Sequence, residues 1–177
     1  MVSQRATGTI VFVSSFLGYT TFAGYSPYSP GKYALRGLAD SLRSELAIYG
    51  INVHLYMPAG ILSPGYEVEQ RTKPQITKDI EEDDTPITPE KAAALLIRGI
   101  EQGHYQITND LVTELVRCSA AGPVPGNGPL DLVYWLIGAI GLPLWRIMTE
   151  KRILKARPAV YKDLETRGFF KDPAAPK

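Results

Sequence analysis

The stretch Gly8-Thr-Ile-Val-Phe-Val-Ser-Ser15-Phe-Leu-Gly18 is the part of the sequence from which the fold can be inferred. Residues 9–14 form a short apolar run that is rich in β-branched side chains and is preceded by Gly8. Such a run is typical of a strand that is buried on both faces of a parallel sheet. Ser15 therefore lies where the predicted strand ends.

A helix is predicted next, over about residues 27–48. Its apolar positions recur at intervals of three and four residues, which is helical spacing: Ala34, Leu35, Leu38, Leu42 and Leu46. Gly50 follows just past the expected end, where a glycine commonly terminates a helix. Tyr28 and Lys32 are four residues apart, so we expect both side chains on one face of this helix.

Ser15, Tyr28 and Lys32 have the chemistry needed to move hydride to or from a carbonyl group. A nearby ammonium lowers the pKa of a phenol toward the working range, so that the phenol can protonate a carbonyl oxygen as hydride reaches the carbon. A second hydroxyl fixes that oxygen and stabilises its developing charge. We therefore predict that Tyr28 is the acid that protonates the carbonyl oxygen, that Lys32 is the electrostatic partner of Tyr28, and that Ser15 donates a hydrogen bond to the same oxygen. Taken singly, each also has a plainer interpretation, as a surface tyrosine, a solvated lysine and a strand-ending serine.

The arrangement resembles the active site of the short-chain dehydrogenase/reductase family, in which a serine, a tyrosine and a lysine follow at this spacing. The family's glycine, three residues after its serine, matches Gly18 and selects Ser15 over Ser14. A second predicted strand, residues 51–57, leads into a Pro58-Ala-Gly-Ile-Leu-Ser63 loop that is similar to the family loop over the nicotinamide. The resemblance implies that Ser15, Tyr28 and Lys32 are catalytic. It further implies that the cofactor contacts Tyr28, Lys32, Pro58, Gly60, the Ile61 backbone and the Ser63 hydroxyl.

The glycine-rich turn that holds a dinucleotide pyrophosphate is not found before Ser15. The glycines of residues 122–128 have a similar spacing, but the two prolines among them indicate a loop. The expected fold is therefore α/β, a partial Rossmann-type, doubly wound parallel sheet that corresponds to the second half of the family fold. We expect this half domain over residues 1–118, and Met1 would then not be the start of a complete enzyme. Residues 119–177 would form a linker, a hydrophobic segment at about 130–148 and a basic, polar tail.

The composition is that of an ordinary globular protein, with 177 residues, a net charge of +1 and 45% hydrophobic residues. It gives no sign of nucleic-acid binding. The single cysteine, Cys118, excludes an internal disulfide. His54 and His104 have no cysteine, histidine or carboxylate partners at ligand spacing, so we expect no metal site.

Two further segments follow the predicted loop. The polar residues 65–84 either cover a substrate cleft or form a solvated surface loop. Thr88 and Pro89 predict the start of a helix that ends at Gly103. Residues 105–108 are predicted to form a last short strand.

Residues 132–145 are fourteen residues without a charge, which is short for a membrane span of about 20 residues. Three interpretations compete: a buried helix, a segment lying in the bilayer interface, and a short or re-entrant insertion. Interfacial aromatics flank the segment, and basic residues follow it, as on the cytoplasmic side of a membrane: Tyr134, Trp135, Trp145, Arg146, Lys151, Arg152, Lys155 and Arg157. We therefore favour membrane association over a core helix.

Within the family, the stretches 28–46 and 63–77 and the hydrophobic carboxy-terminal segment look like the fungal type of 3-ketodihydrosphingosine reductase. That resemblance implies reduction of a long-chain sphingoid ketone with NADPH, at the cytoplasmic face of the endoplasmic reticulum membrane. It also allows a homo-oligomer formed through the active-site helices. Two alternatives remain open: a steroid- or retinol-type short-chain dehydrogenase, and a non-catalytic chain that only associates with a membrane or a partner. In the second case the 9–14 strand would expose an apolar edge to another chain.

Overall fold

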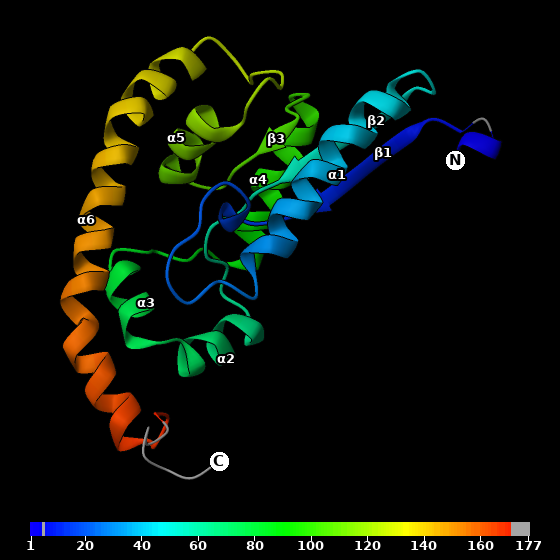
Figure 1. Cartoon of the computed structure of the whole chain (residues 1–177). Helices are drawn as coiled ribbons and strands as arrows, with labels where there is room; N and C mark the ends of the chain where they lie inside the picture. Colours follow the sequence, from blue (N-terminus) through cyan, green and yellow to red (C-terminus); the bar gives the residue numbers. More distant parts are fainter. Residues whose placement is uncertain (5, 171–177) are drawn as a thin grey trace.

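The computed structural model describes residues 1–4 and 6–170, and its centre is a parallel sheet of three strands (Figure 1). The strands are β1 (Gly8–Val13), β2 (Ile51–Tyr56) and β3 (Gln106–Ile107), in the spatial order β1-β2-β3. Gly8 to Val13 of β1 lie opposite Ile51 to Tyr56 of β2, and β3 pairs with the carboxyl end of β2. The predicted α/β class with a parallel sheet is therefore confirmed.

Strand β1 is less buried than the sequence led us to expect. Within the described residues it is the edge of the sheet, and the side chains of Thr9 and Val13 are exposed. The prediction of a strand buried on both faces was therefore wrong. The reason is that an apolar run of this length indicates a strand but does not reveal which neighbours cover it. An apolar edge of this kind favours pairing with a further strand, which stays a prediction.

Helix α1 (Ser29–Ala47) packs against β2 and β1 and closes the hydrophobic core. Pro30 lies in its first turn, where a proline is tolerated, and Gly50 follows its end with a φ of +66°. The buried side chains of the core come from both elements and from later segments: Tyr19, Ala39, Val53, Leu55, Met57, Tyr105 and Val116. On the other face of the sheet, the Tyr56 hydroxyl donates a 3.0 Å hydrogen bond to the Ala92 carbonyl of α4.

Shorter helices precede, connect and follow the strands. They are η1 (Val2–Gln4), η2 (Phe16–Gly18), α2 (Pro64–Thr72), α3 (Gln75–Ile80), α4 (Pro89–Glu101) and α5 (Leu111–Ala120). The hydroxyl or carboxylate of Ser63, Thr88 and Asp110 caps α2, α4 and α5 by accepting a backbone N–H three residues on. The predicted helix after Thr88 is thus confirmed. The polar residues 65–84 mostly form α2 and α3 rather than an extended loop, and residues 122–128 form a loop as predicted.

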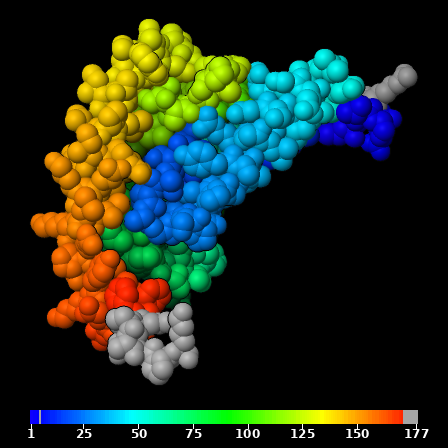
Figure 2. All heavy atoms as spheres, viewed as in Figure 1, coloured from blue at the N-terminus to red at the C-terminus, as the bar shows by residue number. Residues whose placement is uncertain are grey.

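Helix α6 (Asp131–Thr166) is a curved arm of 36 residues along one side of the molecule (Figures 1 and 2). It packs on α5 and α3, and only Gly138 and Thr149 of its residues are buried. By length and composition it is apolar enough to cross a membrane. Most of its large apolar side chains are exposed, among them Leu132, Trp135, Leu136, Ile137, Ile140, Leu144 and Met148. The interpretation of residues 132–145 as a buried core helix is therefore wrong.

Candidate active site

The loops that follow the three strands meet at the carboxyl edge of the sheet. Strand β1 leads to Ser15, β2 leads to residues 57–63 and β3 leads to Asn109. The Phe16 N–H donates to the Pro58 carbonyl over 2.8 Å, and the Ala59 N–H donates to the Asn109 side chain over 2.8 Å. Open α/β sheets bind their ligands at this edge. Ser15 and the 58–63 loop therefore lie at the edge where a ligand is expected, and Asn109 joins them without a sequence signal of its own.

The two serines at the end of β1 have different contacts. The buried Ser14 hydroxyl donates a 2.9 Å hydrogen bond to the backbone oxygen of Lys32. The half-buried Ser15 hydroxyl accepts the Leu17 N–H at 3.2 Å and so caps η2. A hydroxyl that accepts one bond still has its proton to donate. Ser14 thus holds β1 to the first turn of α1, and Ser15 offers a donor to a ligand.

Tyr28 and Lys32 lie at the amino end of α1. Tyr28 is the residue just before the helix, and its side chain is 43% exposed. The Lys32 ammonium lies 5.3 Å from the centre of the Tyr28 ring and 3.4 Å from the Val13 carbonyl oxygen. Because Val13 precedes Ser15 by two residues, Lys32 connects Tyr28 with the end of the strand that carries Ser15. The structure therefore places the lysine beside Tyr28, its predicted electrostatic partner, and against the backbone of the strand that leads to Ser15.

Residues 58–63 form a loop that is pinned at its centre. Ile61 makes an isolated parallel bridge with Ile87, in which Leu62 N–H donates to the Ile87 carbonyl and Ile87 N–H to the Gly60 carbonyl. Both hydrogen bonds are made by the backbone of Gly60 and Leu62, the residues on either side of Ile61. The backbone N–H and C=O of Ile61 itself therefore point away from Ile87. Ser63 accepts the Tyr66 N–H at 3.1 Å and keeps its hydroxyl proton for another partner.

A cavity of about 210 Å³ opens beside Tyr28, and no sequence pattern indicates it directly. The buried Tyr25 lines it, with its ring centre 6.0 Å from that of Tyr28. The Tyr25 hydroxyl lies 2.8 Å from Glu69 and 2.5 Å from Glu81, and both carboxylates also contact the buried Lys73. These contacts join the loop before α1 to α2 and α3. Part of the polar segment 65–84 therefore lines the cavity beside Tyr28, and its role as a cover over a substrate cleft stays a prediction.

The charges around this cavity shift the pKa of two of its groups. Burial and the hydrogen bonds to the Glu81 and Glu69 carboxylates raise the pKa of Tyr25 well above its ordinary value. Burial alone would lower the pKa of Lys73, but the hydrogen bonds to the same two carboxylates outweigh it and the pKa is raised. At neutral pH Tyr25 is therefore a neutral hydroxyl and Lys73 a cation.

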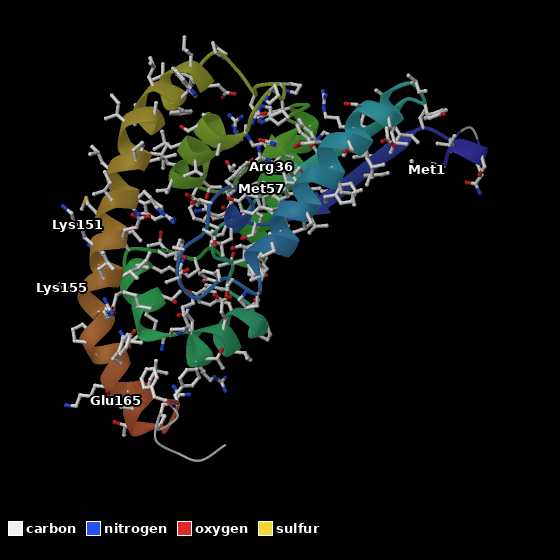
Figure 3. The ribbon with its side chains drawn as sticks, viewed as in Figure 1. Met1, Arg36, Met57, Lys151, Lys155 and Glu165 are labelled. Atoms are coloured by element: carbon white, nitrogen blue, oxygen red, sulfur yellow. The ribbon has the colours of Figure 1, made fainter. Side chains whose placement is uncertain are left out.

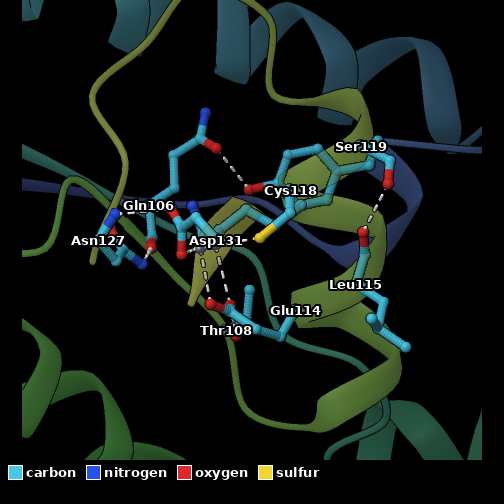
Figure 4. A network of polar contacts seen from close by, with 10 residues as sticks. Gln106, Thr108, Glu114, Leu115, Cys118, Ser119, Asn127 and Asp131 are labelled. Atoms are coloured by element: carbon cyan, nitrogen blue, oxygen red, sulfur yellow. Dashed lines mark hydrogen bonds and ion pairs between the residues drawn. The ribbon is translucent and has the colours of Figure 1, made fainter. Parts of the chain in front are cut away.

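A second polar network lies between α5 and α6 (Figure 4). Glu114, Cys118 and Asp131 offer three atoms within 4.8 Å of one another, which is close enough to hold a metal ion. The buried Arg117 guanidinium, however, donates to Glu114 over 2.7 Å and to Asp131 over 2.6 Å. Since the guanidinium already supplies the positive charge, we interpret this network as an ion-pair clamp between the two helices.

Comparison with known proteins identifies the family. The family model described as short chain dehydrogenase matches residues 1–74, which include Ser15, Tyr28, Lys32 and the 58–63 loop. A 3-ketodihydrosphingosine reductase of Cryptococcus neoformans is 50% identical over 171 residues, or 96% of this chain. The chain belongs to the short-chain dehydrogenase/reductase family. A 3-ketodihydrosphingosine reductase of Aspergillus fumigatus is 37% identical over 150 residues, covering 75% of this chain and 41% of the relative.

This short-chain dehydrogenase/reductase spans about half the length of the curated relatives it matches, 51% in the case of the Cryptococcus protein. A 3-dehydrosphinganine reductase of Danio rerio is 39% identical over 104 residues, which are 59% of this chain and 31% of the relative.

Solved structures share the fold at lower identity. A short-chain dehydrogenase/reductase of Burkholderia phymatum, in complex with NAD, has a TM-score of 0.53 at 18% identity, over 71% of this chain and 53% of that one. A Burkholderia cenocepacia dehydrogenase in complex with NADP has a TM-score of 0.52 at 19% identity, over 66% and 44% of the two chains. The predicted Rossmann-type architecture is therefore confirmed.

Proposed function

We propose that this short-chain dehydrogenase/reductase reduces the 3-keto group of 3-ketodihydrosphingosine to a hydroxyl, in sphingolipid synthesis. The observation that carries the proposal is the position of the Lys32 ammonium, beside the Tyr28 ring and at the end of the strand that bears Ser15. The substrate class is supported by the names of the relatives, which are reductases of this sphingoid ketone in two fungi and of 3-dehydrosphinganine in a fish.

The proposed roles follow from the chemistry of carbonyl reduction, which needs a hydride at the carbon and a proton at the oxygen. Tyr28 donates its hydroxyl proton to the carbonyl oxygen. The Lys32 ammonium stabilises the negative charge that the tyrosine then carries. The Ser15 hydroxyl donates a hydrogen bond to the same carbonyl oxygen and holds it against Tyr28 as charge develops.

NADPH is the cofactor that we propose, and it supplies the hydride when bound. The residues present fit its nicotinamide end. The Ile61 backbone N–H and C=O point away from the Ile87 bridge, which leaves them for a carboxamide, and the Ser63 hydroxyl lies two residues on. Pro58 and Gly60 shape this loop, and Tyr28 and Lys32 would contact the ribose. The choice of NADPH over NADH rests on the resemblance to the sphingoid ketone reductases.

We also propose that α6 associates with the endoplasmic reticulum membrane from its cytoplasmic face. The support is its exposed apolar surface and the basic residues that follow, of which Lys151 and Lys155 point away from the body of the protein (Figure 3). A long-chain substrate partitions into the bilayer, so a site held at the membrane surface meets it at higher local concentration. Exposed Tyr33 and Leu38 on α1 further suit a homo-oligomer through this helix.

Substitution of the proposed acid tests the function. Because the chain spans half of the Cryptococcus reductase, we would assay it as a chimera in which it replaces the matching half of that relative. Tyr28→Phe should lower kcat for 3-ketodihydrosphingosine by a factor on the order of 100 or more, because it removes the transferred proton. Tyr49→Phe, at an exposed tyrosine just past the end of the same helix, is the matched control and should keep full activity. Equal activity of the two variants would contradict the proposal.

A further inference from the structure

The cavity beside Tyr28 has an uneven charge. Tyr28, Tyr25, Glu69 and Lys73 all line it, and Glu81 contacts Lys73 from behind the lining. Two carboxylates thus share one ammonium, which leaves one negative charge in the cluster. The side chain of Lys73 is 4% exposed and that of Glu81 18%, whereas that of Glu69 is 44% exposed. Glu69 is therefore the carboxylate that a ligand in the cavity can reach.

The contacts of Glu69 also leave half of its carboxylate for another donor. The oxygen Oε1 of Glu69 is 2.9 Å from the Lys73 ammonium and 2.8 Å from the Tyr25 hydroxyl, whose single proton it shares with Glu81. The other oxygen, Oε2, has lone pairs for a further donor. Because Tyr25 and Lys73 hold the first oxygen, Glu69 is fixed in place before a ligand arrives, and less side-chain entropy is lost on binding.

The position of this charge matters for carbonyl reduction. A carboxylate on the cavity that holds Tyr28 opposes the negative charge that develops on the tyrosine and on the substrate oxygen. A cationic group bound in the same cavity removes that penalty. The sphingoid ketone of the proposed function carries an amine on the carbon next to the carbonyl, so its ammonium enters the cavity together with the reacting group.

We propose that Glu69 binds the protonated amine of the α-amino ketone substrate and makes this site selective for amino ketones over neutral ketones. The inference rests on the proposed function and names the residue that recognises the substrate. Glu81 keeps Lys73 paired, so that the lysine does not neutralise Glu69 completely. The resulting bond is a charge-assisted hydrogen bond, which is stronger than one between neutral groups.

The test compares two ligands and two variants of the full chain in detergent, by isothermal titration calorimetry. The ligands are a short-chain 2-amino-3-ketone and its N-acetyl derivative, which has the same carbon skeleton without the charge. The measurement is made at pH 6.5, because an α-amino group titrates near ~8 and stays protonated there. Glu69→Gln removes the charge at the proposed site. Glu67→Gln removes an exposed charge on the same helix, where Glu67 lies 4.0 Å from Arg71.

Glu69→Gln should weaken binding of the amino ketone by about 10- to 100-fold and leave the N-acetyl ketone unchanged. Glu67→Gln should leave the affinity for both ligands unchanged. Three results would overturn the inference. The unchanged chain could bind both ligands with equal affinity, or bind neither, or Glu69→Gln could lower the affinity for both ligands by the same factor.

The reductase chimera separates this inference from the proposed function. Reduction of 3-ketodihydrosphingosine with the same KM in Glu69→Gln would refute the role of Glu69 and leave the function standing. Selective, Glu69-dependent binding to the chain without any reduction by the chimera would support Glu69 and refute the function.

Discussion

Gly18 should be the glycine whose replacement by alanine disturbs the site most directly. A Cβ added at Gly18 would lie 2.8 Å from the Ser14 hydroxyl oxygen, 2.8 Å from Met57 Cε and 3.0 Å from the backbone oxygen of Lys32. Met57 is fully buried, and the Lys32 oxygen is a backbone atom that accepts the Ser14 hydrogen bond. The extra methyl group therefore has to push η2 away from the first turn of α1. Overpacking of this kind costs about 1–3 kcal/mol.

Gly37 provides a control of opposite sign. It lies in the middle of α1, and a Cβ added there would meet nothing within 4 Å. Alanine is favoured over glycine inside a helix by about 0.8–1.0 kcal/mol, so Gly37→Ala should stabilise the protein. At roughly 2–4 °C per kcal/mol for a chain of this size, the two variants should differ in Tm by about 4–16 °C.

The assay is thermal unfolding followed by circular dichroism in one detergent, with kcat of the chimera measured beside it. Gly18→Ala should also lower kcat, because moving η2 shifts Ser15 relative to Lys32. A Gly18→Ala protein as stable as Gly37→Ala would refute the reasoning, since it would mean that η2 and α1 are not packed as tightly as the distances indicate.

Three further predictions concern buried charges. Arg117→Met should lower the free energy of unfolding, measured in urea, by about 3 kcal/mol, because it leaves the Glu114 and Asp131 carboxylates without their cation. A triple variant that also carries Glu114→Gln and Asp131→Asn should recover most of this loss. Burial raises the pKa of Cys118 to about 11, so that at pH 8 only about one Cys118 side chain in a thousand is a thiolate. Alkylation of Cys118 should therefore be slow at pH 8 and should accelerate up to pH 11. Fast alkylation at pH 8 would contradict the burial. The raised pKa of Lys73 stabilises the fold fully below its ordinary value of 10.5 and less as the pH rises through the folded value. The raised pKa of Tyr25 has the same direction of effect above about pH 10, so stability should fall with pH in both proteins, and more steeply in the wild type than in Lys73→Met.

The local elements of the fold could be predicted from the sequence because their signals are local. The strand expected over residues 9–14 is Gly8–Val13, and the helix expected over about residues 27–48 is Ser29–Ala47. Both are set by apolar spacing and by a glycine or proline at the end. The spacing of Tyr28 and Lys32 likewise predicted that the ammonium would lie near the phenol ring, whereas the catalytic roles of Ser15, Tyr28 and Lys32 stay a prediction.

The cavity and the length of α6 could not be predicted in the same way. The contacts of Tyr25 with Glu69 and Glu81 join residues 44 and 56 positions apart, and no local pattern indicates them. Helix α6 continues through Pro143 and Pro158 and through a charged stretch, so that the apolar pattern shows less than half of it. Its packing on α5 and α3 extends the helix beyond its apolar part.

Helix α6 is also in direct contact with the loop that leads to Tyr28. The Trp145 ring packs edge-on against Phe22 at 6.1 Å, and the Arg146 guanidinium donates to the Thr21 carbonyl over 2.7 Å. Phe22 in turn packs against Tyr25, which lines the cavity. The apolar helix and the cavity beside Tyr28 therefore share one short loop. If α6 lies at the membrane as proposed, this loop places the cavity next to the lipid surface, and the long chain of the substrate can remain among the acyl chains while its amino ketone end reaches Glu69 and Tyr28.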